Sequence, residues 1–257
     1  MPLTLIGRKA VLAALHRIAH APMDEPAATL ATARTTWVVV LRGEPGSGLT
    51  SMLRAASTMW ATVGWEVVEL PAATLCRVLP RAIPPRSDES RSIDVAVSAL
   101  RGVSRGLDTD MHADPQVEPA GYALLIDDAQ QLDTKSAEAA VALTRFSRRV
   151  PMALLLVQRA PGVLAPGLQR LVDTTLRARR GVVLDLERLS NSDATQLASQ
   201  MLGGAPLSES VAAWLEEQSE GVPGFIEALL HHARDRGSLV LDGGVWTWFD
   251  APEQVQP

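Results

Sequence analysis

Five short apolar runs, separated by stretches with helical periodicity, constrain the fold of this 257-residue chain more than any other feature. The runs cover residues 37–41, 66–70, 122–126, 152–157 and 182–186. Each has the length of a buried β-strand. Between the first two, Met52, Ala56 and Met59 recur four and three positions apart, as on one face of a helix. Because a parallel crossover needs a helix, the alternation predicts an α/β fold with a five-stranded, mostly parallel sheet and flanking helices.

The last quarter of the chain has a different pattern. Helical periodicity fills three consecutive segments, residues 193–202, 209–219 and 224–236. No strand-like run separates these segments, so they predict a small helical subdomain. Ser190, three residues before Asp193, has the spacing of a helix N-cap. Beyond the helices, two short apolar segments flank Gly243 and Gly244, a pattern typical of a β-hairpin.

These two patterns divide the chain into two expected parts. The first is an α/β domain over residues 1–188, and the second is a helical subdomain with a terminal hairpin and tail over residues 189–257. Prolines and charged residues concentrate in residues 80–91 and 107–120, which predicts loops there.

Charge and composition exclude several classes of function. The formal net charge of -5 and a sequence pI near 5.6 provide no overall positive field toward nucleic acid or an anionic membrane. The single cysteine, Cys76, rules out an internal disulfide and a cysteine-rich zinc site. The apolar runs are far shorter than the roughly 20 residues of a membrane-spanning helix. We therefore expect a cytoplasmic protein with no membrane partner.

The stretch directly after the first apolar run carries the strongest chemical signal. Its sequence, Gly43-Glu44-Pro45-Gly46-Ser47-Gly48-Leu49-Thr50, has the spacing of a phosphate-binding P-loop at every position but one, and Ser51 follows it. Glycines let the backbone wrap closely around an anion, and the amides at the start of the next helix stabilise negative charge. We assign this loop through Ser51 to nucleotide binding. The hydroxyl of Thr50 would ligate Mg²⁺.

Leu49 stands where the P-loop pattern has lysine. The lysine reaches the terminal phosphates, and a leucine cannot replace its charge. A charge-assisted hydrogen bond is worth roughly 1.5 to 3 kcal/mol, so its loss weakens nucleotide binding by about one to two decades. Loss of one preorganised donor to developing charge slows a reaction roughly a hundred- to a thousandfold. Hydrolysis is therefore expected to suffer more than binding.

A second motif follows the third apolar run. Asp127 and Asp128 stand directly after that run, at the expected carboxyl end of a strand, where open α/β sheets bind ligands. In a P-loop enzyme, Asp127 would hold the metal directly or through water, and Asp128 would be the general base that positions a water molecule. The alternative is structural: one aspartate caps the next helix and the other is solvated.

The order of these motifs resembles one family. Leu5-Ile6-Gly7-Arg8, the glycine loop, and residues 124–128 followed by Ala-Gln-Gln-Leu-Asp are similar to the AAA+-like nucleotide-binding module of STAND signalling ATPases. Within that group the chain looks most like the module of large LuxR-type (MalT-like) transcriptional regulators. The resemblance runs from Leu3 to about Trp248.

The resemblance implies roles for further residues. Residues 152–157 resemble the family's sensor strand, and Arg159 just beyond them would lie near the γ-phosphate. Residues 220–227 resemble the lid motif, in which Pro223 opens a helix that faces the nucleotide. The family's fold also brings several cations near the phosphates, and these could stand in for the missing lysine: Arg8, Lys9, Arg42 and Arg159. The structural alternative for each is a solvated or packing charge.

Together these patterns predict an ATP- or ADP-binding, Mg²⁺-dependent signalling domain with weak or absent hydrolysis. The bound nucleotide would bias the lid between two orientations and so act on a protein partner or on a second copy of the chain. No DNA-binding element is expected, because no helix-turn-helix pattern follows the lid. The alternative is a pseudo-ATPase scaffold that binds no nucleotide: Leu49 favours it, and Thr50, Asp127 and Asp128 disfavour it. A P-loop kinase is the third possibility, and no acceptor site indicates it.

Overall fold

The computed structural model describes residues 5–24, 36–73, 76, 119–145 and 151–249, and these form two compact units. The first, called here the sheet unit, comprises Ala10–Gly43 and Thr50–Asp185. The second, called here the lid unit, comprises Met1–Lys9, Glu44–Leu49 and Leu186–Pro257. The predicted loop at residues 80–91, and residues 107–118 of the other, lie outside the described residues.

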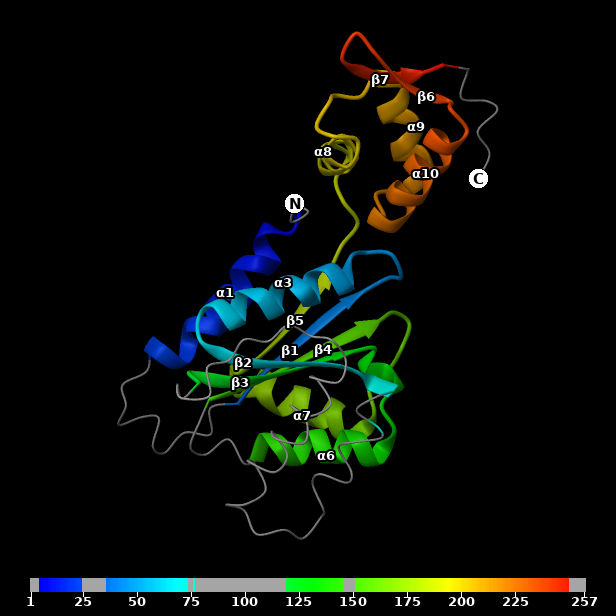
Figure 1. Cartoon of the computed structure of the whole chain (residues 1–257). Helices are drawn as coiled ribbons and strands as arrows, with labels where there is room; N and C mark the ends of the chain where they lie inside the picture. Colours follow the sequence, from blue (N-terminus) through cyan, green and yellow to red (C-terminus); the bar gives the residue numbers. More distant parts are fainter. Residues whose placement is uncertain (1–4, 25–35, 74–75, 77–118, 146–150, 250–257) are drawn as a thin grey trace. The chain divides into compact units, whose positions relative to one another are not determined.

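The described residues of the sheet unit form a five-stranded sheet in the order β2-β3-β4-β1-β5 (Figure 1). They are β1 (Thr36–Gly43), β2 (Trp65–Pro71), β3 (Gly121–Asp127), β4 (Met152–Arg159) and β5 (Gly181–Leu186). The pairs β2·β3, β3·β4 and β1·β4 are all parallel. Each strand contains one of the five apolar runs, so the predicted sheet is confirmed.

Helices cover both faces of this sheet (Figure 1). The helices are α1 (Lys9–Asp24), α3 (Leu49–Thr62), α6 (Thr134–Arg145) and α7 (Pro166–Arg177). In Figure 1, α6 and α7 lie on one face of the sheet, and α1 and α3 lie on the other. This two-sided cover explains why β4 reads as a continuous apolar run: all five residues from Ala153 to Val157 are fully buried.

Two tryptophans fix α1 against the rest of the sheet unit. The indole nitrogen of Trp60, in α3, donates to the carbonyl oxygen of Leu15 at 3.1 Å. That of Trp65, at the start of β2, donates to the carbonyl oxygen of Ala19 at 3.0 Å. Each buried indole N–H therefore has an acceptor, and α1 is held at two successive turns.

Where the structure describes the lid unit, it contains three helices and a hairpin. Its elements are α8 (Asn191–Met201), α9 (Glu209–Ser219), α10 (Pro223–Asp235), β6 (Leu239–Asp242) and β7 (Val245–Trp248). The Ser190 hydroxyl accepts a hydrogen bond from the Asp193 amide, as the capping pattern predicts. The strands β6 and β7 pair antiparallel, which confirms the hairpin. Trp248 of β7 meets Trp214 of α9 edge to face, with ring centroids 4.9 Å apart.

Across the described residues of both units, every helix is too short or too polar to cross a lipid bilayer.

Candidate functional site

The carboxyl ends of three neighbouring strands collect predicted site residues in the sheet unit. Gly43 ends β1, Asp127 ends β3 and Arg159 ends β4. In the parallel register Gly43 lies opposite Arg159, and the Gly43 carbonyl accepts from the Ala160 amide at 2.9 Å. Both ends of the glycine loop, Gly43 and Thr50, belong to this unit. The strand that leads into the loop therefore ends at the same sheet edge as Asp127.

Asp128 and Arg159, the two predicted catalytic residues, form an ion pair. The Nε of Arg159 lies 2.6 Å from the Oδ1 of Asp128, and the two side chains are 42% and 24% exposed. Gln130 completes the arrangement: its amide nitrogen donates to Asp128 at 3.1 Å, and its oxygen accepts from the Arg159 backbone N–H at 3.2 Å. The carboxylate expected to activate water is therefore engaged by two donors. The role of Gln130 was not predicted.

Backbone geometry separates the two aspartates. Asp128 has left-handed dihedral angles, φ 54° and ψ 44°, and its amide donates to the Oδ1 of Asp127 at 2.9 Å. Few non-glycine residues adopt this conformation, although aspartate tolerates it better than most. The turn sends the two neighbouring carboxylates to different partners. Asp128 precedes the 3₁₀ helix η1 (Ala129–Gln131) without capping it through its side chain, so that part of the structural alternative is not observed.

A third carboxylate, Glu69 of β2, also lies near Asp127. Burial raises the pKa of the Glu69 carboxyl, the positive charge of Arg54 opposes this shift, and the negative charge of Asp127 adds to it. Glu69 lies in the run at residues 66–70, which sequence patterns identify only as a buried strand. Those patterns do not show which polar residue of a strand lies near the end of the neighbouring strand, so a place for Glu69 in the site was not predicted.

In the lid unit, the glycine loop has backbone geometry suited to an anion. Gly46 and Gly48 have φ angles of +82° and +94°, values that side chains other than glycine rarely adopt. The Ser47 amide donates to the Glu44 carbonyl at 3.1 Å and so closes a tight turn. Pro45 is exposed, and the helix α3 begins at Leu49. A Cβ added at Gly48 would meet no atom within 4 Å, so the glycine leaves open space beside the loop.

Ser47 supplies a separate indication of a polar ligand. The residue is 2% exposed, and its Oγ has no hydrogen-bond partner among the described residues. Buried hydroxyls nearly always have a partner. A loop with an orphaned hydroxyl, left-handed glycines and a helix start fits a phosphate group. One residue of the loop does not fit a phosphate: Leu49 is 5% exposed and has no charge to offer the ligand. Of the next two residues, Thr50 is half-buried and Ser51 is exposed.

Arg8 holds the loop by its backbone. The residue is 7% exposed, and its guanidinium donates to the Ser47 carbonyl at 2.9 Å and to the Glu187 carbonyl at 2.6 Å. Burial lowers the pKa of the Arg8 guanidinium, and the negative charges of Asp193 and Glu187 partly oppose that shift. The Arg8 guanidinium is therefore engaged with two backbone carbonyls.

The first turn of α10 packs directly on the loop. The Gly224 amide donates to the Gly46 carbonyl at 2.9 Å. A Cβ added at Gly224 would lie 3.0 Å from the Gly46 Cα, so the two backbones approach as closely as glycine allows. Pro223 stands at the start of α10, where its missing N–H costs no hydrogen bond. The predicted lid motif therefore contacts the loop through backbone.

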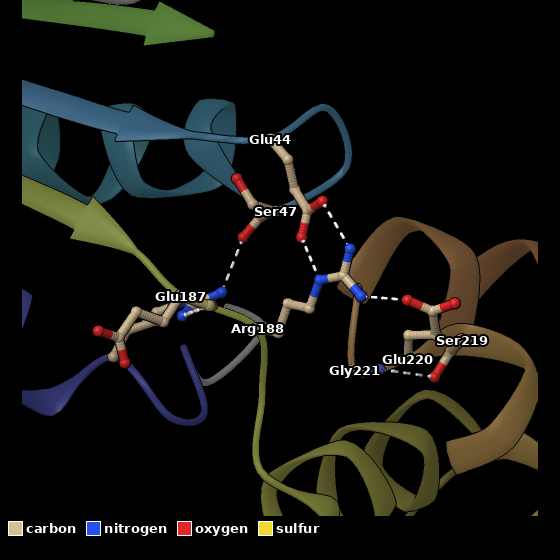
Figure 2. A network of polar contacts seen from close by, with 8 residues as sticks. Glu44, Ser47, Glu187, Arg188, Ser219, Glu220 and Gly221 are labelled. Carbon is tan, nitrogen blue, oxygen red and sulfur yellow. Dashed lines mark hydrogen bonds and ion pairs between the residues drawn. The ribbon is translucent and has the colours of Figure 1, made fainter. Parts of the chain in front are cut away.

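Arg188 joins the loop to the end of α9 through side chains (Figure 2). Its Nε and Nη2 lie 2.8 and 3.1 Å from the two carboxylate oxygens of Glu44, and its Nη1 contacts Glu220. The hydrogen bonds that Arg188 donates to Glu44 and, to a smaller extent, to Glu220 raise the pKa of the Arg188 guanidinium. The sequence Leu-Glu-Arg-Leu-Ser around Arg188 matches no motif, so this residue was not predicted.

The predicted site residues thus form two sets. Asp127, Asp128 and Arg159 share an edge of the sheet unit, while Arg8, Glu44 to Leu49 and Pro223 gather in the lid unit. That the loop amides face the two aspartates stays a prediction.

Comparison with known proteins shows the fold. Neither a family model nor a curated protein matches the sequence. Three solved structures resemble the chain: the Holliday junction branch migration motor RuvB from Thermotoga maritima, the ORC1 protein of Aeropyrum pernix in complex with DNA, and AMPPCP-bound DnaA from Aquifex aeolicus. Their sequence identities to this chain are 17%, 13% and 18%, and their TM-scores are 0.53, 0.55 and 0.53.

The matches cover 90%, 91% and 90% of this chain and 62% of each of the three structures. The chain therefore has the α/β fold of AAA+ P-loop NTPases, which confirms the predicted fold class, and it spans a little over six tenths of the structures it matches.

Proposed function

We propose that this chain is a nucleotide-binding AAA+-like signalling domain that takes ATP or ADP with Mg²⁺ at the glycine loop. The observation that carries the proposal is the loop itself: left-handed Gly46 and Gly48 flank a Ser47 whose buried hydroxyl has no partner among the described residues. The AMPPCP-bound DnaA structure supports the proposal through its similar fold and its bound AMPPCP.

In this proposal different residues would hold the phosphates, hold the Mg²⁺ ion and cover the loop. Amides from Gly46 to Thr50 hold the phosphates, and the start of α3 adds its partial positive charge. The Thr50 hydroxyl and the Asp127 carboxylate would hold Mg²⁺, which draws charge from the phosphates. Pro223 and the first turn of α10 cover the loop, so the presence of nucleotide would alter the packing of α10 on Gly46.

We infer weak or absent hydrolysis. Leu49 removes a cation from the phosphates, and Arg159 together with Gln130 engages Asp128, the proposed base. Water activation requires Asp128 to leave this arrangement. A nucleotide that is hydrolysed slowly suits a switch better than a motor.

The finer assignment is to the STAND ATPases and, within them, to the MalT-like LuxR regulators. The order of the loop, the double-aspartate strand end and the Gly221-Val222-Pro223 lid motif supports it. The chain would then be part of, or derived from, a cytoplasmic regulator that acts through a protein partner or through self-association.

One observation favours a second function, a scaffold that binds no nucleotide. The loop is already held by Arg8, by the Gly224 amide and by the Glu44–Arg188 pair, and Leu49 is buried beside it. These contacts would keep the loop folded without a ligand.

Isothermal titration calorimetry of the whole chain with MgATP and with MgADP separates the two functions. The switch predicts saturable heat for at least one nucleotide at micromolar to millimolar concentration. The matched control is Thr50→Val, which removes the proposed metal ligand and keeps the shape; it should weaken binding only when Mg²⁺ is present. An absence of heat for the wild-type chain at several millimolar nucleotide supports the scaffold.

A further inference from the structure

We propose that Arg188 supplies the positive charge to the bound phosphates that position 49 lacks. This inference rests on the proposed nucleotide-binding function and deepens it by naming the cation of the site. Of the chain's 24 basic residues only Lys9 and Lys135 are lysines, and neither stands in the loop. The other 22 basic residues are arginines, so most candidates for this cation are arginines.

The three arginines expected from the sequence as substitutes for the missing lysine already have other partners. Arg8 is 7% exposed, and its guanidinium donates hydrogen bonds to the Ser47 and Glu187 carbonyls. Arg42 donates to Asp185 at 2.6 and 3.1 Å. Arg159 pairs with Asp128 at 2.6 Å. Arg8 is thus buried against backbone carbonyls, and Arg42 and Arg159 are paired with carboxylates outside the loop.

Arg188 differs because it is exposed and one of its partners is a carboxylate side chain of the loop. Glu44 is the second residue of the glycine loop, and its carboxylate holds the guanidinium through two hydrogen bonds (Figure 2). The Arg188 side chain is 48% exposed, so an incoming ligand can reach it. The described contacts use three of its five N–H groups, and the remaining two are available to a phosphate oxygen. A guanidinium fork matches phosphate geometry well.

Local charge makes Arg188 important for any anion at the loop. Glu44 in the loop and Glu220 near it place two carboxylates at this site, and within the described part of the chain Arg188 contacts both. Without Arg188, phosphates would meet two uncompensated negative charges. With it, the guanidinium can share its donors between carboxylate and phosphate. The buried, unpartnered hydroxyl of Ser47 is a separate indication that a polar ligand belongs here.

The test measures dissociation constants for MgATP and MgADP on the whole chain by calorimetry. Arg188→Gln should weaken binding about ten- to a hundredfold, as expected for the loss of a charge-assisted contact. Arg188→Lys should recover most of the affinity because it restores the charge. The matched control is Arg234→Gln, which removes the same charge from the same unit at the last turn of α10, roughly 16 Å along the helix from its start. It should bind within twofold of wild type.

A second variant keeps the proposal testable if Arg188→Gln does not fold. Glu44→Gln removes one negative charge from the loop and keeps one acceptor oxygen, so it releases at least one N–H group of Arg188 and should tighten nucleotide binding severalfold. Three outcomes would overturn the role of Arg188 while leaving the nucleotide site intact. Arg188→Gln could bind nucleotide as tightly as the wild-type chain, or Arg188→Gln and Arg188→Lys could weaken binding equally. Glu44→Gln could also bind nucleotide more weakly than the wild-type chain. No binding by the wild-type chain would overturn the proposed function as well.

Discussion

The backbone amide of Gly224 donates a hydrogen bond to the carbonyl oxygen of Gly46 at 2.9 Å. Glycine at both positions permits this approach, because a Cβ on Gly224 would lie 3.0 Å from the Gly46 Cα and 3.3 Å from its carbonyl oxygen. The backbone of the glycine loop therefore packs directly against the first turn of α10, and a substitution in either segment should alter the conformation of the other.

Gly224→Ala should destabilise the chain by about 1 to 3 kcal/mol, because backbone has to move to admit the methyl group. Gly167→Ala is a matched control: Gly167 also follows a proline at a helix start, but its Cβ would meet no atom within 4 Å. That control should be neutral or slightly stabilising. Urea unfolding measures both free energies, and equal values for the two variants would contradict the close packing at Gly46.

Gly48→Ala should weaken nucleotide binding at least tenfold, because its methyl group would occupy the open space beside the loop. Gly203→Ala provides the control, since Gly203 has a similar φ of +90° and an equally open Cβ position outside the loop. Both variants carry a backbone strain of roughly 1 to 2 kcal/mol. Calorimetric titration should therefore find a loss of affinity in Gly48→Ala alone. A parallel loss in Gly203→Ala would attribute the effect to general destabilisation.

Leu49→Lys should tighten nucleotide binding about tenfold by restoring the missing cation. Leu49→Met keeps an apolar side chain of similar size and should leave affinity unchanged. Because Leu49 is 5% exposed, the lysine variant should also be less stable without nucleotide. Affinity that does not rise in Leu49→Lys would mean that a charge at this position does not reach the phosphates.

Glu69→Gln should change how stability depends on pH. Burial raises the pKa of the Glu69 carboxyl above its ordinary value of 4.5. Its contribution to stability is therefore present below that value and is lost as pH rises through the folded-state pKa. The melting temperature of Glu69→Gln relative to wild type should rise between pH 4 and pH 7, measured without Mg²⁺. Glu217→Gln, an exposed change on α9, is the control; a flat difference for Glu69→Gln would contradict the burial of its charge.

Much of the architecture could be predicted because it follows from local pattern. The apolar run at residues 152–157 became the first six residues of β4, of which Ala153 to Val157 are fully buried, and the turn at Gly243 and Gly244 joins β6 to β7. The N-cap at Ser190 was predicted for the same reason, since it depends on neighbours three residues away.

The side-chain contacts of the candidate site could not be predicted in this way. Arg188 and Glu44 are 144 positions apart, and the pairing of Asp128 with Arg159 depends on the order in which strands join the sheet. Sequence spacing identifies which residue types can bind phosphate, but it does not reveal which charges already neutralise one another. Gln130 shows the same point, because its amide bridges Asp128 and the backbone of Arg159 across two strand ends.

The central claim is that the amides of the glycine loop bind the phosphates of a nucleotide. Hydrogen–deuterium exchange of the whole chain, followed by mass spectrometry with and without MgATP or MgADP, tests it at peptide resolution. The account predicts slower exchange in the peptides that contain Gly46 to Thr50, and a change in those that contain the first turn of α10. Nucleotide that leaves exchange in the loop peptides unaltered at saturating concentration would contradict the account.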